Sequence, residues 1–385
     1  MGKNAGIRYR RKTKDNEKEV YELTVYAGYN SKGEQIRKYR NVKVNGIVEA
    51  RKERAKFISE VEKGEYFAPS FVTLEEYARN HYLNYVEKEL SPASFALYNS
   101  ILENYIYDYL GDYRLDKLTT QIFEEYFKNL DNHNLSSSTK QKHLNLLKRL
   151  MNLAIENEII KTNPLNKMKP ITIVNKKGTV YSDEEIKTFL QLLNIEENHQ
   201  MSLLLKLAVT TGMRKGEILG LEWKHIDFLN STIAIKQSLS YTKQVGYHLR
   251  EPKTNTSIRT ISISSLLNRE LYKHYKNKLS DKEKAKELWH NDFCFYVFSN
   301  DFGKPLYPTY PDRYYKRFCK RNKFKKIRFH DLRHTHVNYL MNQGATLNDV
   351  SKRLGHSSIS VTVDIYGHLD RSRDQKIASY FDQLL

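Results

Sequence analysis

The stretch LGHSSISVTVDIYGHL, Leu354–Leu369, places a Gly-His pair ahead of a tyrosine, with ten residues from His356 to Tyr366. Taken alone, Tyr366 is one of 28 tyrosines, and an ordinary ring on an amphipathic C-terminal helix would explain it. Its meaning depends on three further segments in the C-terminal half of the chain, which carry arginine, lysine and histidine in a fixed order.

These segments place an arginine at a predicted helix start, a lysine on a turn between two predicted strands, and a histidine and an arginine three residues apart on one helix face. The residues are Arg214 in TTGMRKGEILGLEW (Thr210–Trp223), Lys253 in LREPKTNTSIRTISI (Leu249–Ile263), and His330 and Arg333 in RFHDLRHTHVNYL (Arg328–Leu340). Each residue also has an ordinary explanation: Arg214 could form an ion pair with Glu217, and a lysine in a turn is usually solvated. The ordered set is more informative than any member.

Arginine, lysine, histidine and tyrosine together suit phosphodiester transfer through a covalent intermediate. The planar fork of arginine contacts two phosphate oxygens and stays charged, so two arginines can balance the developing negative charge. A tyrosine oxygen can attack phosphorus and later be displaced by a DNA hydroxyl. With an ordinary pKa of about 10, the tyrosine needs a base or a positive field. The lysine can protonate the leaving 5′-oxygen as a general acid.

A metal site is the alternative interpretation of HDLRHTH, where His330, His334, His336 and Asp331 lie close in sequence. The segment lacks the HExxH pattern and a third ligand at a familiar distance, so we predict no metal and no other cofactor. The chain has no GxxxxGK[ST] loop, which argues against an ATP-driven DNA motor. It also lacks the repeated acidic signature of a two-metal nuclease.

The charge of the chain favours a polyanionic partner. Lysine and arginine number 64 against 45 acidic residues, a formal charge of +19. The excess is clustered, because Met1–Lys14 and Lys316–Arg328 contain six and eight basic residues and no acidic one. Such clusters predict binding to double-stranded DNA, where each neutralised phosphate releases counterions. The predicted DNA-binding residues are Arg8, Arg10, Arg11, Lys12, Lys167, Lys169, Lys176 and Lys177.

Length and composition exclude several classes of protein. A chain of 385 residues with 39% hydrophobic residues is expected to form two or three domains with real cores. No apolar run is long enough to span a bilayer, and the N-terminus has no apolar signal segment. The two cysteines, Cys294 and Cys319, supply neither a disulfide framework nor a zinc quartet. We therefore expect a soluble, cytoplasmic protein.

The fold predicted from residue patterns is multidomain and mainly α-helical. A small β-α domain comes first, with alternating strands over Glu19–Tyr29 and Gln35–Val44 and a helix over Gly46–Gly64. A helical bundle, a basic connector and a mixed α+β domain follow. The predicted boundaries are 1–66, 72–165, 166–178 and 179–385.

Capping residues predict where several helices begin, and short alternating runs predict two strands in the last domain. The helix starts are Thr73, Ser91 before Pro92, Thr119, Ser136–Ser138 and Ser182. The strands are Ser231–Ser238 and Arg259–Ser264.

The ordered pattern resembles the tyrosine recombinases, or phage integrases, and within them the integrases of temperate phages and conjugative transposons of Gram-positive bacteria. The resemblance rests on TGMRKGEILGL, PKTNTSIRTI, HDLRHT, RLGHSSISVT and DIYGH. It implies an arm-type DNA-binding domain, a helical core-binding domain and a catalytic domain. It also implies site roles: Tyr366 as nucleophile, Lys253 as general acid, and Arg214 and Arg333 as phosphate ligands, with His330 and His356 completing the set. Tyr339, inside the H-x-x-R helix, is the nearest rival nucleophile, and packing explains it better.

The resemblance further implies how such an enzyme works. The helical and catalytic domains would close around duplex DNA, and four protomers would exchange strands through a 3′-phosphotyrosyl intermediate and a Holliday junction without metal or ATP. An accessory DNA-bending protein and an excisionase are implied partners. Apolar residues at helical spacing in Gln375–Leu385 predict a helix that docks on a neighbouring protomer, with docking on its own domain as the alternative.

Two other functions fit parts of the sequence. A non-catalytic architectural DNA-binding protein would explain the basic clusters but leaves the complete set of active-site residues unexplained. A type IB topoisomerase shares much of the active-site chemistry. The N-terminal domain and the helical bundle favour recombination over relaxation alone.

Overall fold

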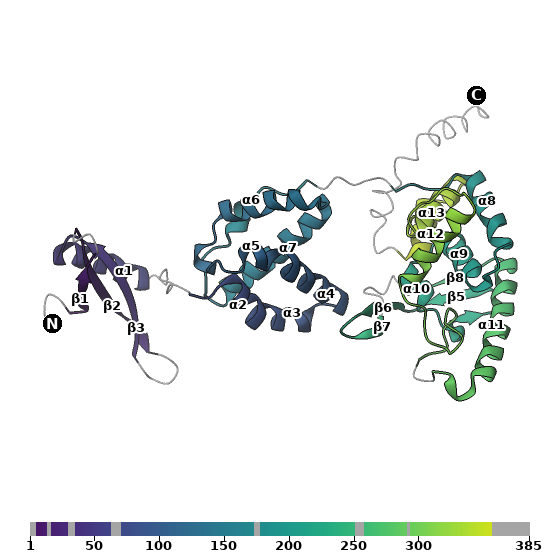
Figure 1. The fold of residues 1–385 in the computed structure, drawn as a ribbon, viewed down its shortest axis with the longest axis horizontal. Coiled ribbons are helices and arrows are strands. Elements are labelled where there is room, and N and C mark those ends of the chain that lie inside the picture. Colours follow the sequence, from purple (N-terminus) through teal and green to yellow (C-terminus); the bar gives the residue numbers. More distant parts are fainter. Residues whose placement is uncertain are drawn as a thin grey trace, which may run out of the picture. The chain divides into compact units, whose positions relative to one another are not determined.

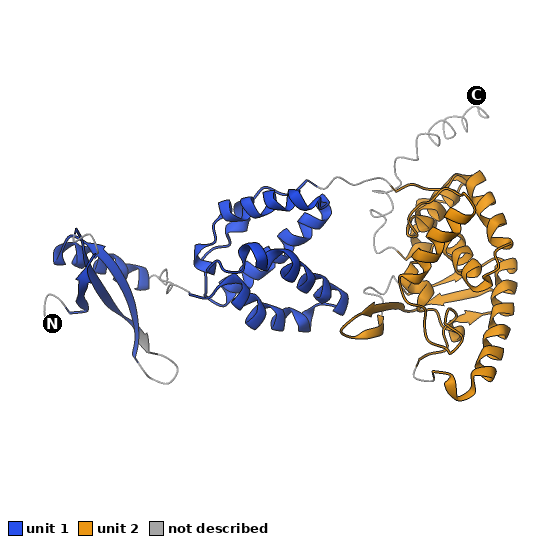
Figure 2. Cartoon of the chain, in the orientation of Figure 1, with its two compact units in different colours: residues 1–174 blue, residues 175–385 orange. Residues whose placement is uncertain are grey.

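The computed structural model describes residues 5–13, 17–29, 35–62, 71–172, 178–250, 258–290 and 293–355. The chain divides into two compact units, residues 1–174 and 175–385 (Figure 2). Each unit is built around its own hydrophobic clusters. Lys176, Lys177, Lys253, His356, Tyr366 and the predicted helix Gln375–Leu385 lie outside the described residues.

The N-terminal part of the first unit is a three-stranded antiparallel sheet with one helix on one face (Figure 1). The order is β1–β2–β3, with bounds β1 Ile7–Lys12, β2 Glu19–Tyr29, β3 Gln35–Val44 and α1 Ile47–Glu62. Alternate residues of β2, namely Tyr21, Leu23 and Val25, are buried with Phe57 of α1. The strands predicted at β2 and β3 are confirmed.

The sequence prediction missed β1. IRYRRK is too polar to signal a strand, and all its residues after Ile7 are exposed. It forms because the long strand β2 offers a free edge, along which Ile7 pairs with Leu23 and Lys12 with Glu19. Backbone hydrogen bonds to an existing edge need no apolar side chain. The basic run therefore lies on a sheet.

A helical bundle makes up the rest of the first unit. Its helices are α2 Leu74–Tyr77, α3 Leu83–Glu89, α4 Pro92–Ile101, α5 Tyr107–Leu110, α6 Thr120–Asn129 and α7 Ser137–Glu156, with π-helical turns at Ala78–Tyr82 and Leu102–Ile106. The predicted starts are confirmed. Thr73 and Glu76 form a capping box with Thr73 N–H to Glu76 Oε2 at 3.0 Å, and Ser91, Thr119 and Ser136 cap their helices.

The second unit is a mixed domain around one central helix, α9. Its helices are α8 Asp183–Asn194, α9 His199–Thr211, α10 Lys215–Leu219, α11 Ser265–Ala285, α12 Tyr310–Arg321, α13 Asp331–Asn342 and α14 Leu347–Leu354. Nearly all of α9 is buried, because α8, α10, α11, α12 and α13 all pack against it (Figure 1). The Ser182 cap with Glu185 is confirmed. No helix in the described part of the chain is long and apolar enough to cross a membrane.

Two small sheets complete this unit. One has the order β4–β5–β8, with β4 Ile226–Asp227, β5 Thr232–Ile235 and β8 Arg259–Ser262, so the two predicted strands are present but shorter. The other is a hairpin of β6 Ser238–Thr242 and β7 Gly246–Arg250, which the sequence prediction missed. The hairpin lies against α10.

A buried histidine in the helical bundle makes stability depend on pH. His143 is fully buried, and Tyr126 Oη lies 2.7 Å from its Nδ1. Burial lowers the pKa of His143 to about 4. The unfolded chain has a histidine pKa of about 6.5, so on acidification it takes up the proton first. Stability is therefore lost as the pH falls from about 6.5 toward 4.

We expect His143→Gln, which keeps an acceptor for Tyr126 but cannot titrate, to flatten this pH dependence. The free energy of unfolding is measured with urea at pH 7.5 and at pH 5.0. Its decrease between the two pH values should be larger in the parent than in the variant, by on the order of 1 kcal/mol. Because every other titrating group is shared, equal losses in the two proteins would contradict the assignment.

Candidate active site

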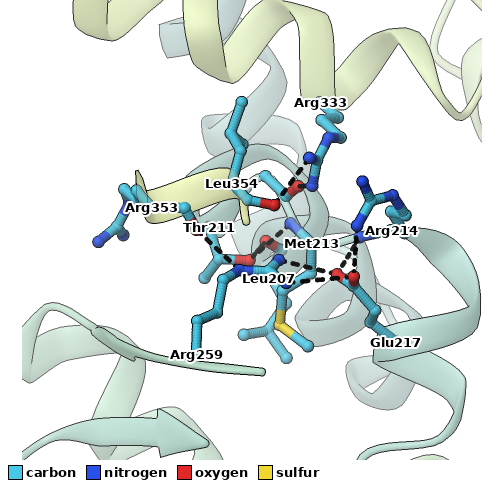
Figure 3. Close-up of polar contacts among 10 residues, drawn as sticks. Leu207, Thr211, Met213, Arg214, Glu217, Arg259, Arg333, Arg353 and Leu354 are labelled. Carbon is cyan, nitrogen blue, oxygen red and sulfur yellow. Dashed lines mark hydrogen bonds and ion pairs between the residues drawn. The ribbon is translucent and has the colours of Figure 1, made fainter. Parts of the chain in front are cut away.

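Three of the six predicted catalytic residues lie in the described part of the chain, and the fold brings their segments together. Arg214 stands at the start of α10, His330 directly before α13, and Arg333 within α13. Figure 3 shows Arg214 and Arg333 near the C-terminal ends of α9 and α14. His330 lies close enough that, in addition to desolvation, the charges of both arginines lower its pKa. Segments more than 100 residues apart in sequence thus form one site, as the motif pattern predicts.

The turn before Arg214 is fixed by a glycine. Gly212 ends α9 in the left-handed region with φ +66°. A Cβ at this position would lie 2.7 Å from His336 Cδ2 and 2.8 Å from Leu354 Cδ2. Both the conformation and the packing therefore exclude a side chain. The chain reverses here and presents Arg214 in extended conformation just before α10.

Arg214 is held by a buried carboxylate. Its backbone N–H donates to Glu217 Oε2 at 2.8 Å, and its Nη1 donates to Oε1 at 2.9 Å. The rest of the guanidinium is open, since the Arg214 side chain is 42% exposed. The ion pair with Glu217 is the ordinary explanation that the sequence offered for Arg214. It leaves part of the arginine fork available to a ligand.

Glu217 also binds a second arginine that sequence reasoning missed. Arg259 of β8 donates from Nη2 to Glu217 Oε2 at 2.9 Å and from Nη1 to Oε1 at 3.2 Å. Burial acts to raise the pKa of Glu217, but Arg259 and then Arg214 outweigh it and hold that pKa below its usual range. The carboxylate is therefore ionised. The only sequence signal for Arg259 is its place in LREPKTNTSIRTISI, six residues after Lys253.

Arg333 ties the remaining segments together. It is 5% exposed, and it donates from Nη1 to the Gly212 carbonyl at 2.6 Å and from Nη2 to the Leu354 carbonyl at 2.9 Å (Figure 3). Gly212 precedes Arg214 by two residues, and Leu354 precedes His356 by two. One buried guanidinium therefore fixes the backbone beside two predicted catalytic positions.

His330 lies at the same site, and part of its surface is open to solvent. Its ring is nearly perpendicular to that of His334, with centroids 5.2 Å apart. Desolvation lowers the pKa of His330, and the charges of His334, Arg333 and Arg214 act in the same direction. A neutral imidazole at neutral pH can accept a proton.

His336 has a supporting role. It is buried, with Nδ1 3.1 Å from the Val209 carbonyl and Nε2 3.4 Å from Arg353 Nε. Nδ1–H therefore donates and Nε2 accepts, which fixes the neutral tautomer. Burial lowers the pKa of His336 to about 3, with the Arg353 charge adding to the effect. Within the described ranges, no group of three or more His, Cys, Asp or Glu side chains is placed to hold a metal ion.

Tyr339, the rival nucleophile, is 38% exposed on α13. It follows Arg333 by six residues, so helical geometry places the two side chains on different faces. Its position does not bring it to the arginine site.

The predicted DNA-binding residues occupy separate surfaces. Lys167 and Lys169 are exposed after α7, and Arg8, Arg10, Arg11 and Lys12 are exposed along β1. In the run Lys316–Arg328, three basic residues form ion pairs within the unit: Arg321 with Glu196, Lys325 with Glu185, and Arg328 with Asp331.

The sheet adds basic residues that sequence reasoning did not single out. In the strand register, Arg11 and Lys43 both pair with Val20, and Arg37 pairs with Tyr26. Paired residues share a face, and this face is opposite to that of Leu23 and Val25, which packs on α1. Tyr39, on the same open face, is 53% exposed.

Comparisons with known proteins agree with this architecture. The Phage integrase family matches residues 180–373, and the Phage integrase SAM-like domain matches residues 73–170. The chain is 30% identical to a protein named Tyrosine recombinase XerC-like from Caldanaerobacter subterraneus subsp. tengcongensis, over 92% of this chain and 93% of the relative. It is also 30% identical to the ICEBs1 integrase of Bacillus subtilis, over 79% of this chain and 81% of that protein.

Solved structures share the fold. The Tn1549 transposon integrase in complex with a circular intermediate DNA superposes with a TM-score of 0.67 at 21% identity, covering 80% of this chain and 99% of that one. A lambda integrase from a tetramer bound to a Holliday junction gives a TM-score of 0.54 at 17% identity, covering 92% and 93%. On the matched family, the full-length relative and the arginine site, the chain belongs to the phage integrase family of tyrosine recombinases, enzymes that transfer DNA strands.

Proposed function

We propose that this recombinase cuts and rejoins DNA at specific sites through a 3′-phosphotyrosyl intermediate on Tyr366, and that it integrates and excises a mobile element. The observation that carries the proposal is the convergence of Arg214, Arg333 and His330 around one anchored backbone. This arrangement supplies fixed positive charge where a scissile phosphate would need it.

Arg214 is the main phosphate ligand in this proposal. One amino group is bound to Glu217, and the side chain is 42% exposed, so the rest of its fork can reach two phosphate oxygens. Arg333 uses two amino groups on carbonyls and is buried, so it adds positive field and holds the site in shape. Arginine suits both roles because its guanidinium is a delocalised cation that offers several donors in a fixed plane.

The proposed chemistry conserves the bond energy of DNA. The Tyr366 oxygen attacks phosphorus while the bond from phosphorus to the 5′-oxygen breaks. Lys253 gives a proton to that leaving oxygen, and neutral His330 accepts the tyrosine proton. His356 is assigned to the phosphate oxygens. A 5′-hydroxyl of the partner strand then displaces the tyrosine in the reverse reaction, so the proposed reaction uses neither ATP nor a metal ion.

Complete recombination requires several copies of the chain. We propose four protomers on two sites, with a Holliday junction between the two strand exchanges, by analogy with the lambda integrase tetramer bound to such a junction. The division into an arm-type domain (1–66), a core-binding domain (72–165), a linker (166–178) and a catalytic domain (179–385) belongs to this proposal. So do an accessory DNA-bending protein, an excisionase and the docking of Gln375–Leu385 on a neighbouring protomer.

The open face of the N-terminal sheet is the proposed contact to arm-type DNA. It combines Arg8, Arg11, Arg37 and Lys43 with the exposed ring of Tyr39. A twisted three-stranded sheet can enter the major groove, where such side chains reach phosphates and base edges. Lys167 and Lys169, with Lys176 and Lys177, would contact the backbone of the core site.

The covalent intermediate is tested on DNA from the locus that carries the gene. We expect the protein, in EDTA, to leave SDS-resistant adducts in which it is joined to a 3′-phosphate at one short sequence. Tyr366→Phe should form none, because the nucleophilic oxygen is missing. Adducts are recovered and their ends sequenced, which also identifies the cleavage site.

Tyr339→Phe is the matched control and should form adducts at the parental rate. Adducts that persist in Tyr366→Phe would refute the assignment of the nucleophile. DNA binding without any adduct would favour an architectural protein, and relaxation of plasmids without joining of two sites would favour a topoisomerase.

The sheet contact is tested by the salt dependence of binding. Replacing both Arg11 and Lys43 by alanine removes two charges from the same face of the sheet, so the slope of log K against log salt should fall by about two on arm-site DNA. Fluorescence anisotropy across a salt series gives the slope. Lys52→Ala, on the exposed side of α1, should leave it unchanged; an equal loss in this control would indicate only a general charge effect.

A further inference from the structure

We propose that Arg259 is a positioning residue for strand cleavage: it holds Arg214 in place through Glu217 and anchors the C-terminal end of α14. The inference rests on the proposed function and adds a residue outside the six that the motifs assign. It comes from three hydrogen-bonded contacts of one buried side chain, drawn in Figure 3.

Arg259 lies where two catalytic segments meet. Its side chain is 6% exposed, on β8, which pairs with β5 through Ile235. Its Nη1 and Nη2 bind the Glu217 carboxylate at 3.2 and 2.9 Å, and its Nε donates to the Arg353 carbonyl at 2.8 Å. The fork of one guanidinium therefore joins the start of α10 to the end of α14.

The first consequence concerns how Glu217 is neutralised. The carboxylate is buried and ionised, so it needs positive partners of its own. Arg259 binds both oxygens of the Glu217 carboxylate. Arg214 then contacts this carboxylate with only its Nη1 and its backbone N–H. Without Arg259, the buried charge would draw Arg214 inward, and Glu217 would bind the amino groups that phosphate needs.

The second consequence concerns the end of α14. The last carbonyls of a helix have no partner within the helix and carry the negative end of its dipole. Here two arginines satisfy successive carbonyls: Arg259 binds that of Arg353, and Arg333 binds that of Leu354. The next residue, Gly355, turns into the left-handed region with φ +64°. Both arginines therefore anchor the end of α14, which precedes the predicted catalytic His356 in sequence.

The test uses the full-length protein and a nicked duplex that carries the cleavage sequence identified from the adducts. Single-turnover adduct formation is measured at saturating protein, together with the dissociation constant for the same DNA and the thermal midpoint. The variants are Arg259→Gln, Arg259→Lys, Glu217→Gln and the double variant Glu217→Gln/Arg259→Gln. Arg269→Gln, an exposed arginine on α11, is the matched control for loss of charge.

Arg259→Gln should slow adduct formation by about 10- to 100-fold, the usual cost of losing a residue that orients a catalytic ligand, while DNA affinity changes by less than about 2-fold. Arg259→Lys keeps the charge but not the fork, so it should recover the rate only in part. The double variant should be faster than Arg259→Gln alone, because a neutral amide no longer competes for Arg214.

Two results would overturn the inference while the parent still forms adducts. One is an Arg259→Gln rate equal to that of Arg269→Gln. The other is a double variant no faster than Arg259→Gln, with both thermal midpoints lowered, since a residue that only supports folding gives no recovery. If the parent protein forms no adduct at all, that result would instead refute the proposed function and, with it, this inference.

Discussion

The buried guanidinium of Arg333 is the contact on which the rest of the site depends. A charge taken out of water must be compensated, and here two backbone carbonyls, from Gly212 and Leu354, do so. Both lie at helix ends where the chain turns through a left-handed glycine, Gly212 itself and Gly355. Such turns leave carbonyls unpaired, so the same feature that ends α9 and α14 creates the acceptors that Arg333 needs.

Local chemistry explains which elements could be predicted well. The capping box at Thr73 and the cap at Ser182 depend on residues three positions apart, so helix starts could be placed without knowing the fold. The strand β1 could not, because a polar strand forms only where the edge of another strand accepts its backbone hydrogen bonds. The hairpin of β6 and β7 was also missed, although its two strands pair with each other across a short turn. Arg259 was missed because its partners, Glu217 and Arg353, are 42 and 94 residues away in sequence.

Only the site residues that belong to sequence motifs could be predicted. The arginine and histidine segments come together as the pattern requires, although periodicity alone would not have paired α9 with α13. Lys253, His356 and Tyr366 lie outside the described residues, so their roles stay predictions. Two arginines, Arg214 and Arg259, share the one carboxylate of Glu217, while Arg333 donates to backbone carbonyls.

The separate hydrophobic clusters have a consequence for how such proteins diversify. The sheet of the N-terminal part packs Leu23 and Phe57 with α1 and leaves its other face to solvent, so residues there can change without disturbing any interior packing. The arginine cluster allows no such freedom, because Arg259 and Arg333 each bind two segments at once. Substitutions on the open face of this sheet can therefore accumulate without cost to the packing of either unit, and a designer could vary that face while leaving the arginine cluster unchanged.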